Sequence, residues 1–122
     1  MANDKSSEIL RLQKETCLKY GISEFEPESM VAVALETLGQ SPVYGERVVL
    51  EEGEKISWFF YCGKFSEDKD FFKPVHTEHL SEILPNVLKF LRMPPGSGFV
   101  VDLYGGEEIW INENGSVIVK RI

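Results

Sequence analysis

The segment Met93-Pro94-Pro95-Gly96 separates a helical stretch of the chain from a run of strands. Before it, apolar residues recur at helical spacing from about residue 77 to residue 91. Proline cannot continue the hydrogen-bond ladder of a helix and disfavours helix in the residue before it, so the chain turns here. After it, short apolar runs alternate with glycine-containing turns, which predicts a three-strand meander. The expected strands are 99–104, 108–111 and 117–122.

The first forty residues predict one helix and one strand. Apolar residues at helical spacing favour a helix over 7–20, with Ser6 as its N-cap and Gly21 ending it in the left-handed conformation. Residues 30–38 suit either a helix or a strand, but the alternation of β-branched side chains favours a strand.

The middle of the chain predicts a hairpin followed by an aromatic loop. Residues 47–50 and 56–61 flank a Glu-Gly-Glu turn, which indicates antiparallel pairing. Aromatic residues fall on both faces of the second strand, so we expect both of its sides to be covered. Residues 64–73 are polar apart from three phenylalanines, which indicates a loop held by those rings. Thr77 then suits a helix cap, and Pro85 either begins a second short helix or kinks the first.

These elements together predict an α+β domain. The sheet is mostly antiparallel, the N-terminal helix and a second helical segment at about 77–91 pack on it, and the meander lies at the C-terminus. Hydrophobic residues make up 43% of the chain, which is too many for a disordered segment. No repeat, linker or block of like charge divides the sequence, so we expect one domain over 1–122, with residues 1–5 flexible.

Charge and cysteine use restrict the partners and the compartment. The chain has 13 Lys+Arg against 20 Asp+Glu, a net charge of −7, which would repel a nucleic-acid backbone. No apolar run approaches the ~20 residues of a membrane helix, and the polar N-terminus lacks the pattern of a signal peptide. Cys17 and Cys62 form no short-spaced pair, so we expect packed, reduced thiols. We therefore predict a cytoplasmic protein that binds neither nucleic acid nor membrane.

Two short clusters invite a chemical interpretation. His76 and His79 flank a carboxylate and lie near Asp70, which is compatible with a metal or hydrolytic site, but no third ligand stands at a diagnostic spacing. Hydrogen bonding in the loop ahead of the helix is the commoner role of such histidines. Ser97 follows a helix and precedes a strand, the reverse of the order in nucleophile elbows and phosphate loops. We therefore predict no catalytic residue, no metal and no cofactor.

The two tryptophans have different expected settings. Trp58 lies on a central strand and suits the core. Trp110 lies between two isoleucines, so it points to the face opposite theirs, where it is either a partly exposed binding anchor or a core filler. The acidic residues around this hairpin, among them Glu107 and Glu108, form either a solvated face or a docking surface for a basic partner.

Five segments, in this order along the chain, carry a family resemblance. They are 42–47, the aromatic strand 58–63, the Asp-Phe-Phe-Lys-Pro-Val-His segment at 70–80, the Pro-Pro-Gly segment at 91–96, and the Glu-Glu-Ile-Trp segment at 107–110. Together they resemble the thirty-third type of immunity domain in polymorphic toxin systems, a family of small bacterial immunity proteins. The resemblance spans about residues 30–112.

The resemblance implies a protein that neutralises a cognate protein toxin by binding it, with no catalytic set. We expect Trp110, Glu107, Glu108 and Asp70 to contact that toxin, which is expected to be basic because opposite charge speeds association. The residues expected to serve the structure are His76, His79, Pro94, Pro95 and Gly96.

The chain departs from the family pattern in two places. Ser97-Gly98 stand where relatives tend to carry Trp-Arg, and Asn112 stands where an aspartate is common, so these positions are candidates to face the partner. Two other functions stay open. One is a small metal-dependent or hydrolytic enzyme that uses the region of His76 and His79. The other is a ligand-binding accessory domain, which a deep apolar pocket beside either tryptophan would favour.

Overall fold

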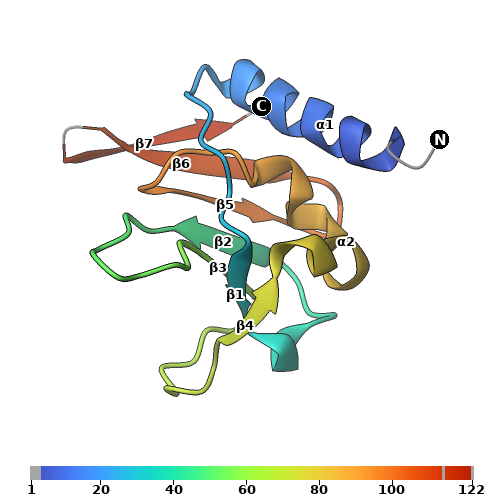
Figure 1. Cartoon of the computed structure of the whole chain (residues 1–122), viewed down its shortest axis with the longest axis vertical. Coiled ribbons are helices and arrows are strands. Elements are labelled where there is room, and N and C mark those ends of the chain that lie inside the picture. The colour runs from blue at the N-terminus through green and yellow to red at the C-terminus, as the bar shows by residue number, and fades with distance from the viewer. Residues whose placement is uncertain (1–3, 114, 122) are drawn as a thin grey trace.

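The computed structural model describes residues 4–113 and 115–121 of the chain, and within them seven strands form one sheet (Figure 1). The order across the sheet is β4-β1-β3-β2-β5-β6-β7. The strands are β1 Met30–Val33, β2 Val43–Arg47, β3 Trp58–Cys62, β4 Lys73–His76, β5 Ser97–Val101, β6 Glu107–Glu113 and β7 Ser116–Arg121. The helices are α1 Asp4–Tyr20 and α2 Leu80–Ile83, with 3₁₀ helices η1 Leu35–Thr37, η2 Thr77–His79 and η3 Pro85–Phe90.

Strand pairing confirms the predicted α+β class. Adjacent strands of the described sheet pair antiparallel except β1 and β3, which run parallel. The strands β5, β6 and β7 form the predicted C-terminal meander. Gly105 and Gly115 adopt φ angles of +82° and +83° in its turns, a conformation that other residues rarely adopt.

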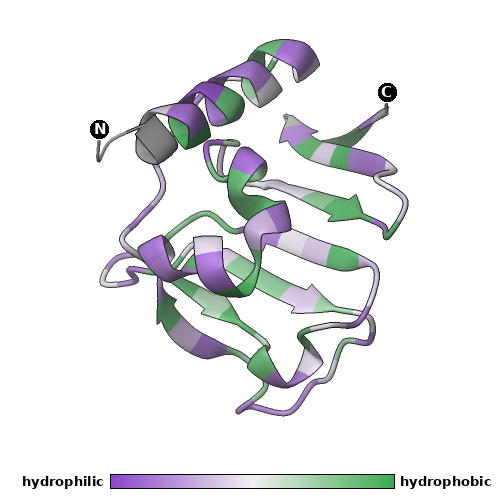
Figure 2. Cartoon of the chain, turned by 90° about the vertical axis from the view of Figure 1, so that its right-hand side faces the viewer, coloured by the Kyte–Doolittle hydropathy of each residue, from purple (hydrophilic) through white to green (hydrophobic). Residues whose placement is uncertain are grey.

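The core lies between the sheet and the helices. Figure 2 shows α2 and the 3₁₀ segments in front of the strands, on what we call the helix face. Side chains at alternate strand positions point to this face and pack against buried residues of the helical segment such as Leu80, Val87 and Phe90. The strand residues of this core include Val31, Val33, Trp58, Phe60, Phe99, Ile109 and Ile111. The prediction that Trp58 belongs to the core is confirmed, since its side chain is fully buried.

The N-terminal helix begins earlier than its sequence pattern predicts. The helix α1 starts at Asp4, so Ser6 lies inside it and is not its N-cap, and residues 4 and 5 are helical. The expectation of flexibility for 1–3 falls outside the described residues. The predicted stop at Gly21 is confirmed, because its φ is +68° and the amides of Gly21 and Ile22 donate to carbonyls of the last turn.

The second helical segment is interrupted. Thr77 does not cap it, because the Thr77 hydroxyl donates to the carbonyl of Glu28 at 2.7 Å. Pro85 begins η3 after Leu84 leaves helical geometry, with φ −154°, which agrees with the alternative of a second short helix. Residues 73–76, which carry no strand pattern, form the edge strand β4, where Pro74 is tolerated.

Two other strands differ from their predicted bounds. The strand expected over 30–38 ends at Val33 and is followed by η1. The first strand of the predicted hairpin is β2, which begins at Val43 rather than at Arg47. As a result, residues 43–47 contribute side chains to both faces of the sheet. The expected hairpin did not include residues 43–46.

Arg47 is a buried cation that ties distant segments together. Its side chain is 2% exposed and lies on the helix face, 5.8 Å from the centre of the Trp58 ring. Its guanidinium donates to the carbonyls of Phe25, Glu26, Leu91 and Met93, to the Ser57 hydroxyl and to the Glu28 carboxylate. These bonds join β2 to the linker after α1 and to the chain that leaves η3, so the residue fixes how three parts of the fold meet.

Both cysteines are free and buried, as expected for packed thiols. Burial raises the pKa of Cys17 to about 11, so its thiolate is scarce at neutral pH. No helix in the described part of the chain is long and apolar enough to cross a membrane.

Candidate binding groove on the open sheet face

The face opposite the helices, which we call the open face, carries one row of residues that crosses the whole sheet. Paired positions on neighbouring strands point to the same side, so the register places them next to one another. From β4 to β7 the row is Pro74, Ala32, Phe59, Glu46, Gly98, Trp110 and Val119. Only one member of this row, Glu46, carries a charge.

Trp110 lies flat across the strand beside it because that strand has a glycine at the paired position. A Cβ on Gly98 would lie 2.2 Å from the Trp110 indole atom Cζ2, which is closer than non-bonded atoms approach. The indole therefore occupies the space that a side chain on β5 would fill, and it reaches towards β2. Trp110 is half-buried, which agrees with the alternative of partial exposure.

Aromatic side chains from β3 and from the loop after it form a second wall. The Phe59 and Phe72 rings meet edge to face with their centres 5.3 Å apart, and Phe65 packs on Tyr61 at 5.5 Å. The predicted loop at 64–73 is thus held by its phenylalanines. Phe59 and Tyr61 nevertheless remain half-buried, so the expectation of cover on both sides of β3 is met only in part.

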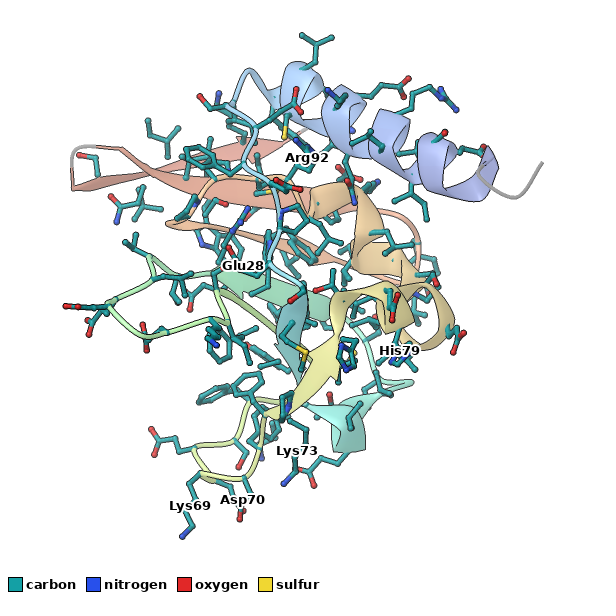
Figure 3. The ribbon with its side chains drawn as sticks, in the orientation of Figure 1. Glu28, Lys69, Asp70, Lys73, His79 and Arg92 are labelled. Atoms are coloured by element: carbon teal, nitrogen blue, oxygen red, sulfur yellow. The ribbon has the colours of Figure 1, made fainter. Side chains whose placement is uncertain are left out.

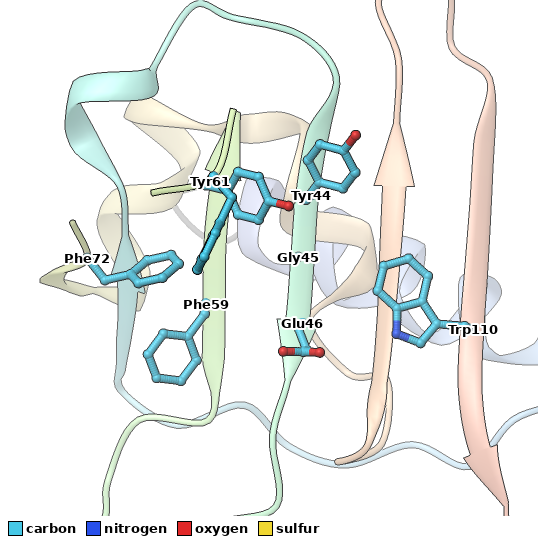
Figure 4. Close-up of a pocket in the computed structure, with 8 residues that line it drawn as sticks. Tyr44, Gly45, Glu46, Phe59, Tyr61, Phe72 and Trp110 are labelled. Carbon is cyan, nitrogen blue, oxygen red and sulfur yellow. The ribbon is translucent and has the colours of Figure 1, made fainter. Parts of the chain in front are cut away.

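A groove of about 360 Å³ lies between this aromatic wall and Trp110 (Figure 4). Tyr44 and Glu46 of β2 lie between the two walls, with Tyr44 stacked on Tyr61 at a ring separation of 4.8 Å. Burial raises the pKa of Tyr61, and the neighbouring Tyr44 and the Glu46 carboxylate raise it further. The Glu46 carboxylate therefore lies close enough to the Tyr61 phenol to disfavour its ionisation.

Two of the expected contact residues lie on or near the open face. Glu108 lies on the open face in the row next to that of Trp110, paired with Val100 of β5. Asp70 is exposed near the tip of the loop between β3 and β4, the loop that also supplies Phe65 and Phe72 (Figure 3). Trp110 and Glu108 are therefore brought together, and Asp70 stands apart from them.

Glu107 lies on the helix face instead. Its side chain is 5% exposed, accepts a hydrogen bond from the Tyr20 hydroxyl at 2.5 Å, and forms ion pairs with Lys19 and Lys89. Burial favours a raised pKa for Glu107, but the hydrogen bonds from Lys89 and Tyr20 and the two lysine charges lower it below its usual value. The residue therefore fastens α1 and η3 to β6, and a partner on the open face would not reach it.

We expect Glu107→Gln to lower the free energy of unfolding by about 1–2 kcal/mol at pH 7, because it removes charge-assisted hydrogen bonds from a buried site. A lowered pKa in the folded state stabilises the protein above the usual carboxyl value of 4.5, and this contribution is lost as the pH falls through that region. Urea unfolding at pH 7 and pH 3 measures the difference. A gap between variant and parent that stays equal at both pH values would contradict the assignment.

The two histidines lie side by side but form no recognisable metal site. Both are exposed, and their ring centres are 5.6 Å apart. Figure 3 places Asp70 at the loop tip, away from His79. Among the residues that the structure describes, no three His, Cys, Asp or Glu side chains are grouped closely enough to hold a metal ion.

The family departures have different surroundings. Ser97 is fully buried, and its hydroxyl donates to the Pro94 carbonyl at 2.5 Å, so it cannot face a partner. Gly98 lies beneath Trp110, where it acts through the position of the indole. Asn112 is exposed on the open face, beyond Trp110 along β6.

Sequence reasoning missed the groove residues Tyr44, Glu46, Phe59 and Tyr61 as candidates. In the structure Glu46 stands between two buried positions, Gly45 and Arg47, but a glycine and an arginine do not read as buried in the sequence.

The fold and the groove together define an α+β domain with one helix-covered face and one open, aromatic face. The model of the Imm33-like domain family matches residues 12–112, and the chain belongs to this immunity-protein-like family. The match begins within α1, earlier than the resemblance in the five segments. No curated protein and no solved structure matches the chain.

Proposed function

We propose that the protein binds and neutralises a cognate protein toxin in the cytoplasm of the cell that makes it, by covering a toxin surface rather than by chemistry. The observation that carries the proposal is the groove beside Trp110, an aromatic surface that the fold leaves open. Family membership supports a toxin as the partner. A half-buried tryptophan next to a groove is typical of the anchors that dominate binding free energy.

The proposed contact set is Trp110 and Glu108 on the open face, with Asp70 on the neighbouring loop. Glu107 is left out of it, because its carboxylate is 5% exposed and paired with lysines. The net charge of −7 favours a basic toxin, since opposite charge raises the association rate.

The test is co-expression with each candidate toxin domain that the genes neighbouring this one encode. We expect the parent protein to restore growth and to form a complex with an inactivated toxin. The Trp110→Ala variant should weaken that complex by about 30-fold, which corresponds to the loss of one anchor residue. Isothermal titration calorimetry measures the affinity.

Tyr104→Ala is the matched control, because it removes an aromatic ring that is 94% exposed on the turn between β5 and β6. It should leave affinity and growth unchanged. Failure of every neighbouring toxin candidate to give either a complex or survival would overturn the proposal.

The groove also favours a second candidate, a ligand-binding accessory domain. Its volume of about 360 Å³ falls within the range of small-molecule sites. A small molecule that purifies with the parent protein and is lost from Trp110→Ala, together with no toxin complex, would support this alternative over the first.

A further inference from the structure

We infer that the groove receives an arginine side chain of the partner, with the guanidinium against Glu46 and among the aromatic rings. This inference rests on the proposed function and names the chemistry that the open face recognises. It follows from three features of the groove: its rings, its single charge and its size.

The first feature is the density of rings. Six of the eight residues that line the groove are aromatic. The faces of aromatic rings carry negative potential and attract a cation within about 6 Å of their centres. Rings alone would accept an apolar side chain equally well, so the choice of occupant depends on the other lining residues.

The second feature is the carboxylate of Glu46, the single charged group among those eight residues. It is exposed, and among the described residues no hydrogen bond or ion pair to it is found, whereas the Glu28 and Glu107 carboxylates each bind a cation of the chain. An apolar occupant would bury this carboxylate without a partner, which is costly. A cationic occupant would pair with it.

The third feature is the shape of the site, which favours arginine over lysine. A planar guanidinium stacks on an indole such as Trp110 while its N–H groups pair in bidentate fashion with a carboxylate, whereas an ammonium has no planar face to stack and no bidentate fork. The methylene stem of arginine packs against rings on the way in. A volume of about 360 Å³ accommodates one long side chain of the partner and is too small for a whole helix.

The experiment is an NMR titration of the indole N–H resonances with N-acetyl-arginine amide. Trp58 is the internal reference, because its indole N–H is buried and donates to the Leu91 carbonyl at 3.0 Å. We expect the Trp110 resonance to shift in a saturable way with a dissociation constant of about 1 mM, and the Trp58 resonance to stay in place. The Trp110→Phe variant assigns the two signals.

The charge is tested with Glu46→Gln, which should weaken binding of the arginine amide by about fivefold. Glu36→Gln removes the same charge from η1, which contributes no residue to the groove, and should leave binding unchanged. Equal shifts with the neutral N-acetyl-citrulline amide, or equal affinity of the Glu46→Gln variant for the arginine amide, would overturn the inference.

The two proposals fail in different ways. A toxin complex that tolerates Glu46→Gln but is weakened by Trp110→Ala removes the arginine site and leaves the neutralising function standing. Binding of the arginine amide that depends on Glu46, with no toxin complex, supports the site and removes the function.

Discussion

The Arg47→Met variant is expected to lose about 3–5 kcal/mol of stability, a large part of the roughly 5–15 kcal/mol that holds a domain of this size together. Methionine fills a similar volume but donates no hydrogen bond. The Glu28 carboxylate would lose its cation, and four backbone carbonyls would lose a charged donor. Urea unfolding followed by far-ultraviolet circular dichroism measures the loss.

Two further variants make this result specific. Arg47→Lys keeps the charge but cannot reach all the acceptors, so it should recover less than half of the lost stability. Glu46→Gln changes the adjacent residue on the opposite face, and its effect should stay within about 0.5 kcal/mol. If the free energy of unfolding of Arg47→Met lies within about 1 kcal/mol of the parent value, the buried guanidinium does not hold the segments together.

The Gly45→Ala variant is expected to lose about 3 kcal/mol through overpacking. A Cβ at this position would lie 2.2 Å from Cε2 of Phe99 and 2.9 Å from Cδ1 of Phe60. Phe99 cannot retreat, because it stacks on Phe90 with ring centres 4.1 Å apart and also touches Trp58. The midpoint of urea unfolding reports the change.

Gly98→Ala is the matched comparison, because both glycines lie in strands and both face an aromatic ring. Trp110 is half-buried and can swing outward, so Gly98→Ala should cost about 1 kcal/mol. It should also displace the indole from the groove and weaken arginine binding. Equal destabilisation by the two variants would show that Phe99 has more room than its contacts indicate.

Local patterns predicted the fold class but not its long-range pairings. Alternation and glycine turns identified the meander, because its strands are neighbours in sequence and in space. The parallel pairing of β1 with β3 joins strands separated by β2, and no local pattern encodes it. The strand β4 is largely polar and contains a proline, so its sequence does not predict a strand. It is a strand because its backbone pairs with that of β1.

The candidate site was predicted in part for a similar reason. Side chains alternate between the two faces along β6, which correctly placed Trp110 on the face away from the core. The same alternation places Glu107 with Ile109 on the helix face. Grouping Glu107 and Glu108 as acidic residues around one hairpin ignores that their side chains point to opposite faces. The groove itself depends on β2, β3 and β6 meeting across β5, which only the register of the sheet reveals.

The opposite orientations of Glu46 and Arg47 bear on how such a scaffold can change during evolution. These adjacent residues of β2 have separate roles: Glu46 lines the groove, and Arg47 holds segments of the core together. A substitution of an exposed groove side chain such as Glu46 is therefore expected to alter what the groove binds with little effect on the free energy of unfolding. Under the proposed function, a lineage of such domains can follow changes in its partner through single substitutions of exposed side chains on one face, while the other face preserves the fold.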